Sequence, residues 1–274
     1  MSIIKDSPIT DPVDKLWTQL RAEALAAAAL DPALTRAMNA AVLHHPSFDA
    51  ALAHRLAAKL ASPDLDHDEM LYLVCQTIRD TPAIIPATTA DLAAVRDRDP
   101  SITDFLTPFL YFKGFLALQG HRVAHELWTQ GRTHLARHIQ SRISEAFGVD
   151  IHPAAQIGQG VMLDHGSGLV IGETAVVEDD VSILQNVTLG GTGKETGDRH
   201  PKIRRGALIG AGAKILGNIE IGTGAKIGAG SVVVNPVAPF TSVVGVPARV
   251  VGHPHTALPG VTMNQSMPAF DYVI

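Results

Sequence analysis

An aliphatic residue returns every six positions across residues 151–251 of this 274-residue chain. Grouped in sixes from Ile151, the stretch gives fifteen hexads, and twelve of them begin with Ile, Leu or Val. The whole apolar class fills only about half of the positions in an ordinary domain. A period of six matches neither an amphipathic helix nor an alternating strand. It predicts a solenoid in which hexapeptides stack into coils.

The hexad pattern has one interruption. After Val187 the next hexad would begin at residue 193, but the aliphatic position resumes at Ile203. The ten extra residues, 193–202, read GKETGDRHPK, so they are polar and contain two glycines. We expect them to leave the solenoid as an exposed loop, since loops on a rigid scaffold are where binding and catalytic groups concentrate.

Simple geometry relates the hexad to a triangular coil. Three hexads make one coil of about 18 residues, with the leading aliphatic residue of each hexad pointing inward. Burying each of these side chains stabilises the fold by roughly 1.5–3 kcal/mol. Fifteen hexads therefore predict about five coils. The hexads that lack a leading Ile, Leu or Val begin at Ala175, Pro239 and Gly245. Two of these lie in the last coil, as expected of a terminal cap.

The residues before the solenoid have a helical period. Asp11-Pro12 is a capping residue followed by proline at a first helical position. Apolar residues then recur at helical spacing, for example at Leu71, Val74, Cys75 and Ile78. Two prolines predict a break over residues 81–89. We predict an α-helical domain over 1–149, a solenoid over 150–252 with its loop at 193–202, and a flexible tail over 253–274.

Composition excludes several classes of function. The net charge is −5 and the pI about 6.2, and there is no long basic run, so neither nucleic acid nor an anionic membrane is an expected partner. Cys75 is the only cysteine, which excludes an internal disulfide. The sequence has no apolar signal segment and no apolar run long enough to span a membrane. A reducing, cytoplasmic setting is expected.

Two histidine pairs have the i, i+4 spacing that can bind a metal on a helix. They are His121 with His125 and His134 with His138, and neither belongs to an HExxH-like motif. A carbonic anhydrase built on hexads would need a third histidine ligand, which the stretch from His165 to His200 does not supply. We therefore predict no metal site.

Several longer motifs, in the same order along the chain, resemble those of the bacterial serine acetyltransferase family. They are AVRDRDP at 94–100, FLYFKGFLALQ at 109–119, DIHPAA at 150–155, LDHGSGLVIGETA at 163–175, VSILQNVTLGGTGK at 181–194, DRHPKI at 198–203, IGAGAKILGNI at 209–219 and GVPARVVG at 245–252. The resemblance implies an α+β fold, with an N-terminal α-helical domain followed by a left-handed parallel β-helix. It also implies transfer of acetyl from acetyl-CoA to the hydroxyl of L-serine, giving O-acetyl-L-serine and CoA. This is the first step of cysteine biosynthesis, and feedback inhibition by cysteine is expected.

Acetyl transfer to a hydroxyl needs a base, and histidine has a suitable pKa. His165 is the leading candidate, and the resemblance makes it the general base, oriented by Asp150. The spacing of these two residues is three short of one 18-residue coil, so we expect them to approach at adjacent stacked positions. The alternative interpretation of His165 is a solvated corner residue.

The resemblance also assigns the groups that bind serine. Arg199 and His200 of the loop are expected at the carboxylate, which an arginine can bind through two hydrogen bonds. Asp99 and Asp164 are expected near the ammonium. Without the resemblance, Asp97 and Asp99 could be a charged, solvated turn, and Arg199 and His200 could belong to an ordinary polar loop.

Acetyl-CoA needs a long groove for its pantetheine arm. The small residues Gly191, Thr192, Ala211 and Ala229 have backbone that can bind the arm, and Lys226 can approach the phosphates. Hexad corners and a solvated face explain the same residues almost equally well.

Partners are implied by the resemblance alone. A site whose loop and base belong to different coils is most simply formed between neighbouring subunits of a homotrimer, and two trimers would join through the helical half as a hexamer. The tail, which ends at Ile274, would dock into cysteine synthase.

Two other functions stay open from the residues. One is a hexapeptide acetyltransferase for another small hydroxyl acceptor, such as homoserine or a sugar. The other is a non-catalytic assembly module, against which the combination of Asp150, His165 and His200 argues.

Overall fold

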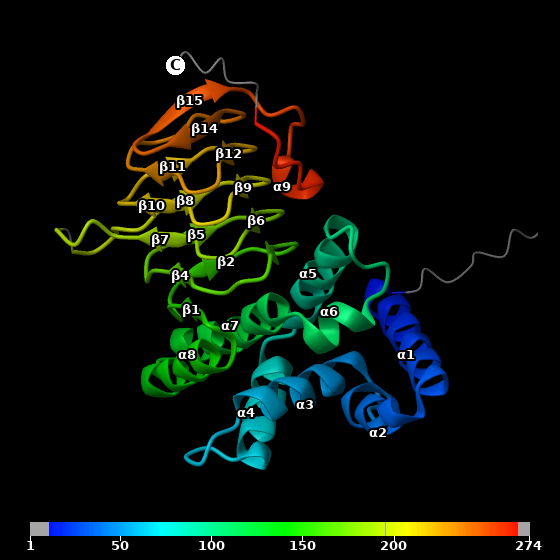
Figure 1. The fold of residues 1–274 in the computed structure, drawn as a ribbon. Coiled ribbons are helices and arrows are strands. Elements are labelled where there is room, and N and C mark those ends of the chain that lie inside the picture. Colours follow the sequence, from blue (N-terminus) through cyan, green and yellow to red (C-terminus); the bar gives the residue numbers. More distant parts are fainter. Residues whose placement is uncertain (1–10, 195, 268–274) are drawn as a thin grey trace, which may run out of the picture.

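The computed structural model describes residues 11–194 and 196–267, and these form a helical region followed by a β-solenoid (Figure 1). Helices fill the first half of the chain, blue to green in Figure 1, and the coils stack on one side of them. The helical region followed by a parallel solenoid of about five coils confirms the predicted fold class. Ile274 lies outside the described residues.

The helical region begins where the Asp11 side chain accepts a hydrogen bond from the Val13 amide at 2.9 Å, which confirms the predicted cap. A 3₁₀ turn (Pro32–Leu34) and a π turn (Asn39–Leu43) flank the short second helix. The α-helices are α1 (Pro12–Leu30), α2 (Thr35–Met38), α3 (Phe48–Leu60), α4 (His67–Asp80), α5 (Ile84–Arg98), α6 (Leu106–Tyr111), α7 (Lys113–Thr129) and α8 (Thr133–Phe147).

The predicted break over residues 81–89 is wrong beyond residue 83, because α5 begins at Ile84. Pro86 lies in the first turn of that helix. The amides of a first helical turn have no partner within the helix, so a proline costs little there.

Three flat sheets form the sides of the solenoid. The first face contains β1 (Val149–Ile151), β4 (Leu169–Ile171), β7 (Thr188–Gly190), β10 (Lys214–Leu216) and β13 (Val232–Val233). The second contains β2 (Gln156–Ile157), β5 (Val176–Val177), β8 (Lys202–Ile203) and β11 (Glu220–Ile221). The third contains β3 (Met162–Leu163), β6 (Ser182–Ile183), β9 (Leu208–Ile209), β12 (Lys226–Ile227), β14 (Ser242–Gly245) and β15 (Ala248–Gly252). Every pair is parallel except β14 with β15, which closes the last coil as a hairpin.

The strand register divides the ten extra residues between two places. Met162 pairs with Ser182, twenty residues later, and Ser182 with Leu208, twenty-six residues later, whereas Leu208 and Lys226 are the expected eighteen apart. Relative to 18, two extra residues lie between Leu163 and Leu169 and eight lie between β7 and β8. The expectation of a single ten-residue insertion is therefore wrong. Leu169 and Ile171 are both buried, so the aliphatic pattern alone does not reveal the first insertion.

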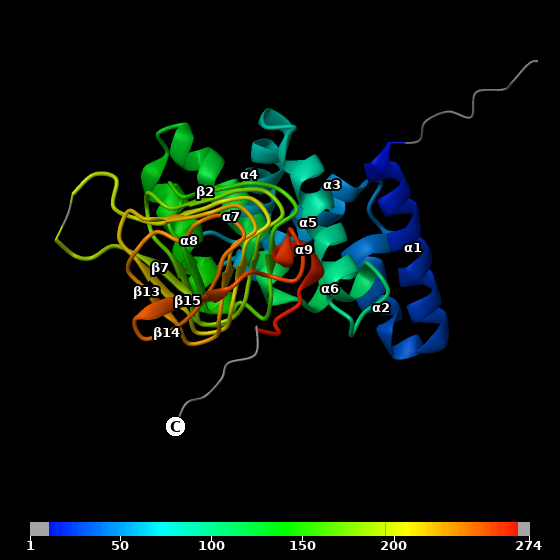
Figure 2. The same cartoon turned by 90° about the horizontal axis from the view of Figure 1, so that it is seen from above.

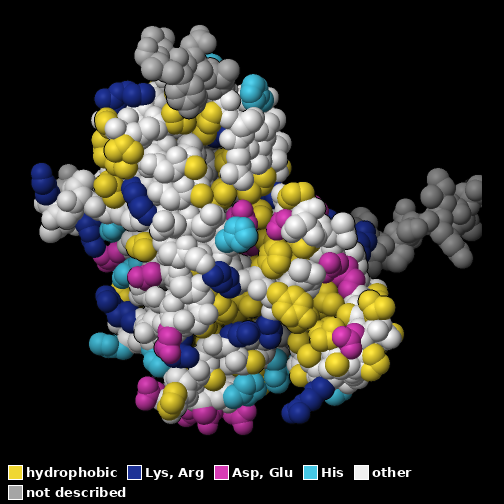
Figure 3. Space-filling view, viewed as in Figure 1, with side chains coloured by type: hydrophobic (Ala, Val, Ile, Leu, Met, Phe, Trp, Pro, Cys, Tyr) yellow, Lys and Arg dark blue, Asp and Glu magenta, His cyan; other side chains and the backbone are white. Residues whose placement is uncertain are grey.

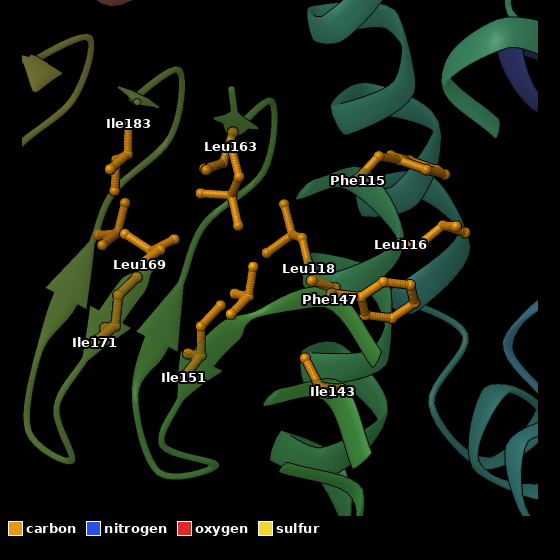
Figure 4. Packing of buried hydrophobic residues seen from close by; sticks show 14 of the residues in the cluster. Phe115, Leu116, Leu118, Ile143, Phe147, Ile151, Leu163, Leu169, Ile171 and Ile183 are labelled. Carbon is orange, nitrogen blue, oxygen red and sulfur yellow. The ribbon is translucent and has the colours of Figure 1, made fainter. Parts of the chain in front are cut away.

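The solenoid and the helical region share one core. In Figure 4, Phe115, Leu116 and Leu118 of α7 and Phe147 of α8 lie beside the inward side chains of the first coils, and these residues form one buried cluster. A buried ion pair crosses the same junction, because Arg122 Nη2 lies 2.7 Å from Asp91 Oδ2 and Asp91 Oδ1 accepts the Val161 amide. The two parts are thus packed as one body.

Segments outside the coils lie at two places. The long loop after β7 projects away from the solenoid in Figures 1 and 2. After the β14–β15 hairpin the chain returns along the third face, where α9 (Pro259–Thr262) packs on β6 and β9 and Ser182 donates to the Gly260 carbonyl at 2.6 Å. Within the described residues, no helix is both long and apolar enough to cross a membrane.

Candidate active site

A pocket of about 400 Å³ lies where α5, α7 and the end of β3 meet, and it contains three predicted site residues. Asp99 ends α5, while Asp164 and His165 follow β3. The structure therefore brings together residues that are 66 positions apart in the chain. An imidazole beside two carboxylates is an arrangement that can accept a proton next to a bound cation.

The two-residue insertion explains how His165 is presented. The widened turn, residues 164–168, needs left-handed backbone at His165, Gly166 and Gly168, with φ of 56°, 71° and 71°. Lys113 at the start of α7 donates a hydrogen bond to Ser167 and so anchors the turn. The His165 side chain remains 75% exposed. The turn thus directs the imidazole outward instead of into the coil.

Glycine at position 114 allows the helix to approach this turn closely. A Cβ there would lie 2.0 Å from the Leu163 carbonyl oxygen, and that distance is too short for any side chain. Gly114 is therefore a requirement of the pocket, although glycine in a helix costs up to about 1 kcal/mol.

The surroundings of Asp164 in the pocket shift the pKa of its carboxyl. Burial raises the pKa of the Asp164 carboxyl, nearby His165 lowers it, and the negative charge of Asp99 raises it. His165 Nε2 lies 3.9 Å from Asp164 Oδ1. A bound ammonium would relieve the repulsion between the two acids, which favours the predicted role of this pair.

A second cluster lies at the edge where the chain leaves the first face for the second. We call this the leaving edge (residues 152–155, 172–175, 191–194, 196–201 and 217–219). Arg199 of the long loop pairs with Glu173 at 2.7 Å. His200 is only 7% exposed, and its ring covers Gly172, where a Cβ would lie 2.1 Å from Nε2. Burial, followed by the charge of Arg199, lowers the pKa of His200.

Thr174 holds the base of the loop, and the sequence interpretation missed it together with Glu173. Its hydroxyl accepts the backbone amides of Arg199 at 3.0 Å and His200 at 3.1 Å, and it lies 2.9 Å from His200 Nδ1. The signal available in the sequence was the triplet Gly172-Glu173-Thr174, one coil below the loop, with a charge opposite to that of Arg199.

Asp150 and His165 are not joined within one chain. The Asp150 side chain accepts a hydrogen bond from Gln140 of α8 at 2.7 Å and lines a separate surface pocket. Its register partner in the next coil is Val170, so the stacking expected from the spacing of 15 is wrong. Among the described residues, no hydrogen bond or ion pair connects Asp150 with His165.

Four of the five residues predicted to bind acetyl-CoA are divided between two edges of the solenoid. Gly191 and Thr192 lie at the leaving edge, where the loop starts. Ala211 and Ala229 lie in the turns that lead from the third face to the first, which we call the entering edge (residues 164–168, 184–187, 210–213 and 228–231). His165 lies at this entering edge too, so each edge has one part of the predicted machinery.

Lys226 does not lie on an open surface. It is 2% exposed, and its ammonium donates to the Ser266 carbonyl under the C-terminal segment. The expectation that it approaches the phosphates of CoA is therefore contradicted in this conformation. The sequence pattern places Lys226 on the outer side of β12 correctly, but it cannot show what covers that side.

Family models match both halves of the chain. Residues 16–120 match the model described as the N-terminal part of serine acetyltransferase, and residues 200–235 match the bacterial transferase hexapeptide model of six repeats. Repeats of this kind on a solenoid, with an imidazole and two carboxylates in a pocket beside them, define a hexapeptide-repeat transferase.

Relatives and solved structures identify the family within that class. Serine acetyltransferase of Salmonella typhimurium is 53% identical over 255 residues, which cover 93% of each chain. The crystal structure of the Vibrio cholerae serine acetyltransferase has a TM-score of 0.91 at 53% identity and covers 92% of this chain and 98% of that one. The chain belongs to the serine acetyltransferase family, which confirms the resemblance and the acyltransferase class.

Three similar structures hold small molecules. A serine acetyltransferase in complex with cysteine has a TM-score of 0.91 at 50% identity, covering 94% of this chain and all of that one. The Brucella abortus enzyme in complex with coenzyme A has a TM-score of 0.87 at 52% identity, covering 88% and 96%. The soybean enzyme complexed with serine has a TM-score of 0.86 at 50% identity, covering 88% and 100%.

Proposed function

We propose that this chain transfers the acetyl group of acetyl-CoA to the hydroxyl of L-serine, giving O-acetyl-L-serine and CoA as the first step of cysteine biosynthesis. The observation that supports this most is the pocket that joins the exposed imidazole of His165 to the carboxylates of Asp99 and Asp164. Family relatives bound to serine and to coenzyme A support the two substrates.

His165 acts as the general base in this proposal. It accepts the serine hydroxyl proton while the oxygen attacks the thioester carbonyl, the C–S bond breaks, and the imidazolium returns the proton to the leaving thiolate. Asp99 and Asp164 hold the ammonium, and Arg199 and His200 hold the carboxylate. Asp150 stabilises the imidazolium, a role that stays a prediction.

The same proposal requires more than one copy of the chain. The base and Asp164 lie at the entering edge, with Asp99 of α5 in the same pocket, whereas the carboxylate-binding loop lies at the leaving edge. We infer that the site forms between neighbouring copies of a homotrimer, with acetyl-CoA bound along Gly191 and Thr192 of one copy and Ala211 and Ala229 of the next. Lys226 could contribute only after the C-terminal segment moves away.

A complementation experiment tests the shared site. Subunits bearing His165→Ala and subunits bearing Arg199→Ala are inactive or weak alone, but mixed trimers contain some sites with both native residues. Co-expression should recover activity that neither variant has by itself. Activity no higher than the average of the two variants would show that each site lies within one chain.

We also propose that two trimers join through the helical region as a hexamer. Large hydrophobic side chains are exposed there, including Leu30 at 89% and Tyr72 at 70%. In Figure 3 hydrophobic side chains gather over the helices at the lower right. Light scattering of the full chain and of Leu30→Glu would test this interface.

The substrate is tested by measuring thiol release from acetyl-CoA with serine, homoserine, a sugar or no acceptor. Serine should give the highest kcat/KM by a wide margin, and cysteine should inhibit in competition with serine. A higher rate with homoserine or a sugar would replace the proposed acceptor, and no release with any of them would favour an assembly module.

We further propose that the C-terminal tail docks into cysteine synthase in the cytoplasm, with Ile274 as its terminal contact. Removing the last ten residues should abolish co-purification with that enzyme and leave acetyl transfer intact. A complex that forms equally well without them would contradict the idea.

A further inference from the structure

A second cavity, of about 320 Å³, lies at the junction of the helical region and the first two coils. Its apolar wall comes from the start of α5 and from β2, and its polar wall comes from α7 and from the turn after β5. The apolar lining residues are Ala83, Ile84, Ala87 and Ile157. None of the residues assigned to acetyl transfer lines this cavity, so it requires an explanation of its own.

One wall of the cavity contains a buried imidazole with an unused nitrogen. His121 is 1% exposed, and its Nδ1 has no hydrogen-bond partner within the described part of the chain. Burial is the main reason that its pKa lies well below the usual value, so the ring is neutral. A buried polar nitrogen without a partner is costly, so Nδ1 is a place where a bound molecule could make a hydrogen bond.

The arginine beside this wall is largely engaged with other groups. Arg122 points its guanidinium at the Asp91 carboxylate and at the carbonyls of Ile157 and Gly158. His125 Nδ1 lies 2.8 Å from the Pro153 carbonyl, so it holds the proton and leaves Nε2 as an acceptor. The polar wall is therefore rich in acceptors.

Two carboxylates add negative charge at the same place. Glu126 Oε2 accepts the Thr81 hydroxyl at 3.1 Å, and Asp179 Oδ1 accepts the Gln159 amide at 2.8 Å. The other oxygen of each accepts no hydrogen bond from the described residues. The nearby charges of Asp91 and Arg122 cancel as an ion pair, so the lining has a net negative charge at neutral pH.

We propose that this cavity binds a small organic primary ammonium compound, with its N–H groups on the acceptors of the polar wall and its alkyl part against the apolar wall. The net negative charge of the lining disfavours an anion, and the described residues hold no group of three or more side chains suited to a metal ion. The ligand would contact α5, α7 and both coils, so its binding would stabilise the junction. This proposal does not depend on the acetyl-transfer reaction.

The test uses n-butylammonium as the probe, with n-butanol and butyrate as isosteric controls, on the full chain. We expect saturable binding of butylammonium by calorimetry and a rise in melting temperature, because a ligand that binds only the folded state stabilises it. Butanol and butyrate should give neither. Equal binding of butanol, or no binding of the ammonium, would overturn the proposal.

Isosteric variants locate the site. Glu126→Gln and Asp179→Asn keep the oxygens that accept from Thr81 and Gln159, so both should fold, and each should weaken butylammonium binding by about tenfold or more, the cost of one charged hydrogen bond. Ala87→Leu fills the cavity and should abolish binding. Asp99→Asn is the matched control, since it changes the other acidic pocket. Binding that is lost in Asp99→Asn and kept in the first two would place the ligand in the serine pocket and refute the proposal.

Discussion

The two edges of the first face differ in how their functional residues are anchored. At the entering edge, residues 164–168 contain only two extra residues and pack directly against α7, where Gly114 permits the contact. At the leaving edge, eight extra residues project from the solenoid, and the loop is held at its base by Thr174 and Glu173. A short insertion braced by a helix suits a base that must be positioned accurately. A long loop suits a group that closes on a substrate.

The largest effect should come from the entering edge. His165→Ala should lower kcat by about 10²–10⁴-fold at saturating substrates, because that is what a positioned general base contributes. Steady-state kinetics with serine and acetyl-CoA would measure it. His67→Ala, an exposed histidine of α4, is the control and should keep full activity. Normal turnover in His165→Ala would remove the base assignment.

At the leaving edge, Arg199→Ala should act on binding more than on chemistry. Loss of charged hydrogen bonds to the carboxylate should raise the KM for serine about 10- to 100-fold, with a smaller change in kcat. Glu173→Gln is a useful companion, because it keeps a hydrogen-bond acceptor for Arg199 and should have a weaker effect. A fall in kcat with unchanged KM would show that Arg199 acts in the chemical step instead.

A smaller effect should follow from loosening the loop without touching its charged groups. Thr174→Val removes the acceptor of two backbone amides, so it should raise the KM for serine by about tenfold or less. Thr174→Ser keeps the hydroxyl and should behave like the parent protein. If both variants bound serine normally, the hydrogen bonds at Thr174 would not be what orders Arg199 and His200.

The smallest effect concerns how stability and serine binding depend on pH at the entering edge. The pKa of Asp164 is raised, mainly by burial, so the folded protein holds this proton more tightly than the unfolded chain does. The carboxyl therefore contributes stability at low pH that is lost as pH rises through the raised pKa. Asp164→Asn should melt slightly higher at pH 7, and its KM for serine should no longer increase as pH falls through that range.

Melting curves and a pH series of serine KM would check the last prediction. If the KM for serine in Asp164→Asn still increased as pH falls, another group, such as Asp99, would control ammonium binding. A lower melting temperature at pH 7 would mean that the charged form of Asp164 stabilises the folded protein.

A site residue could be predicted from the sequence only where its structural position leaves a signal in the local sequence pattern. The polar loop with Arg199 and His200 was predictable, because a polar run interrupts the strict aliphatic period. The widened turn at His165 was found only through its motif, because Leu169 and Ile171 both satisfy the aliphatic pattern. The burial of Lys226 was not predictable, because the covering segment near Ser266 is distant in the sequence and has no period of its own.

The sequence by itself determined the local repeats: a six-residue period must stack, a 3.6-residue period must form helices, and the change of period near Asp150 marks the boundary between them. Only the tertiary structure decided where the functional groups meet. Asp99 reaches Asp164 and His165 because α5 and α7 dock on the first coil through a glycine and a buried ion pair. Such contacts depend on close packing between distant segments, and no periodicity within either segment encodes the distance between them.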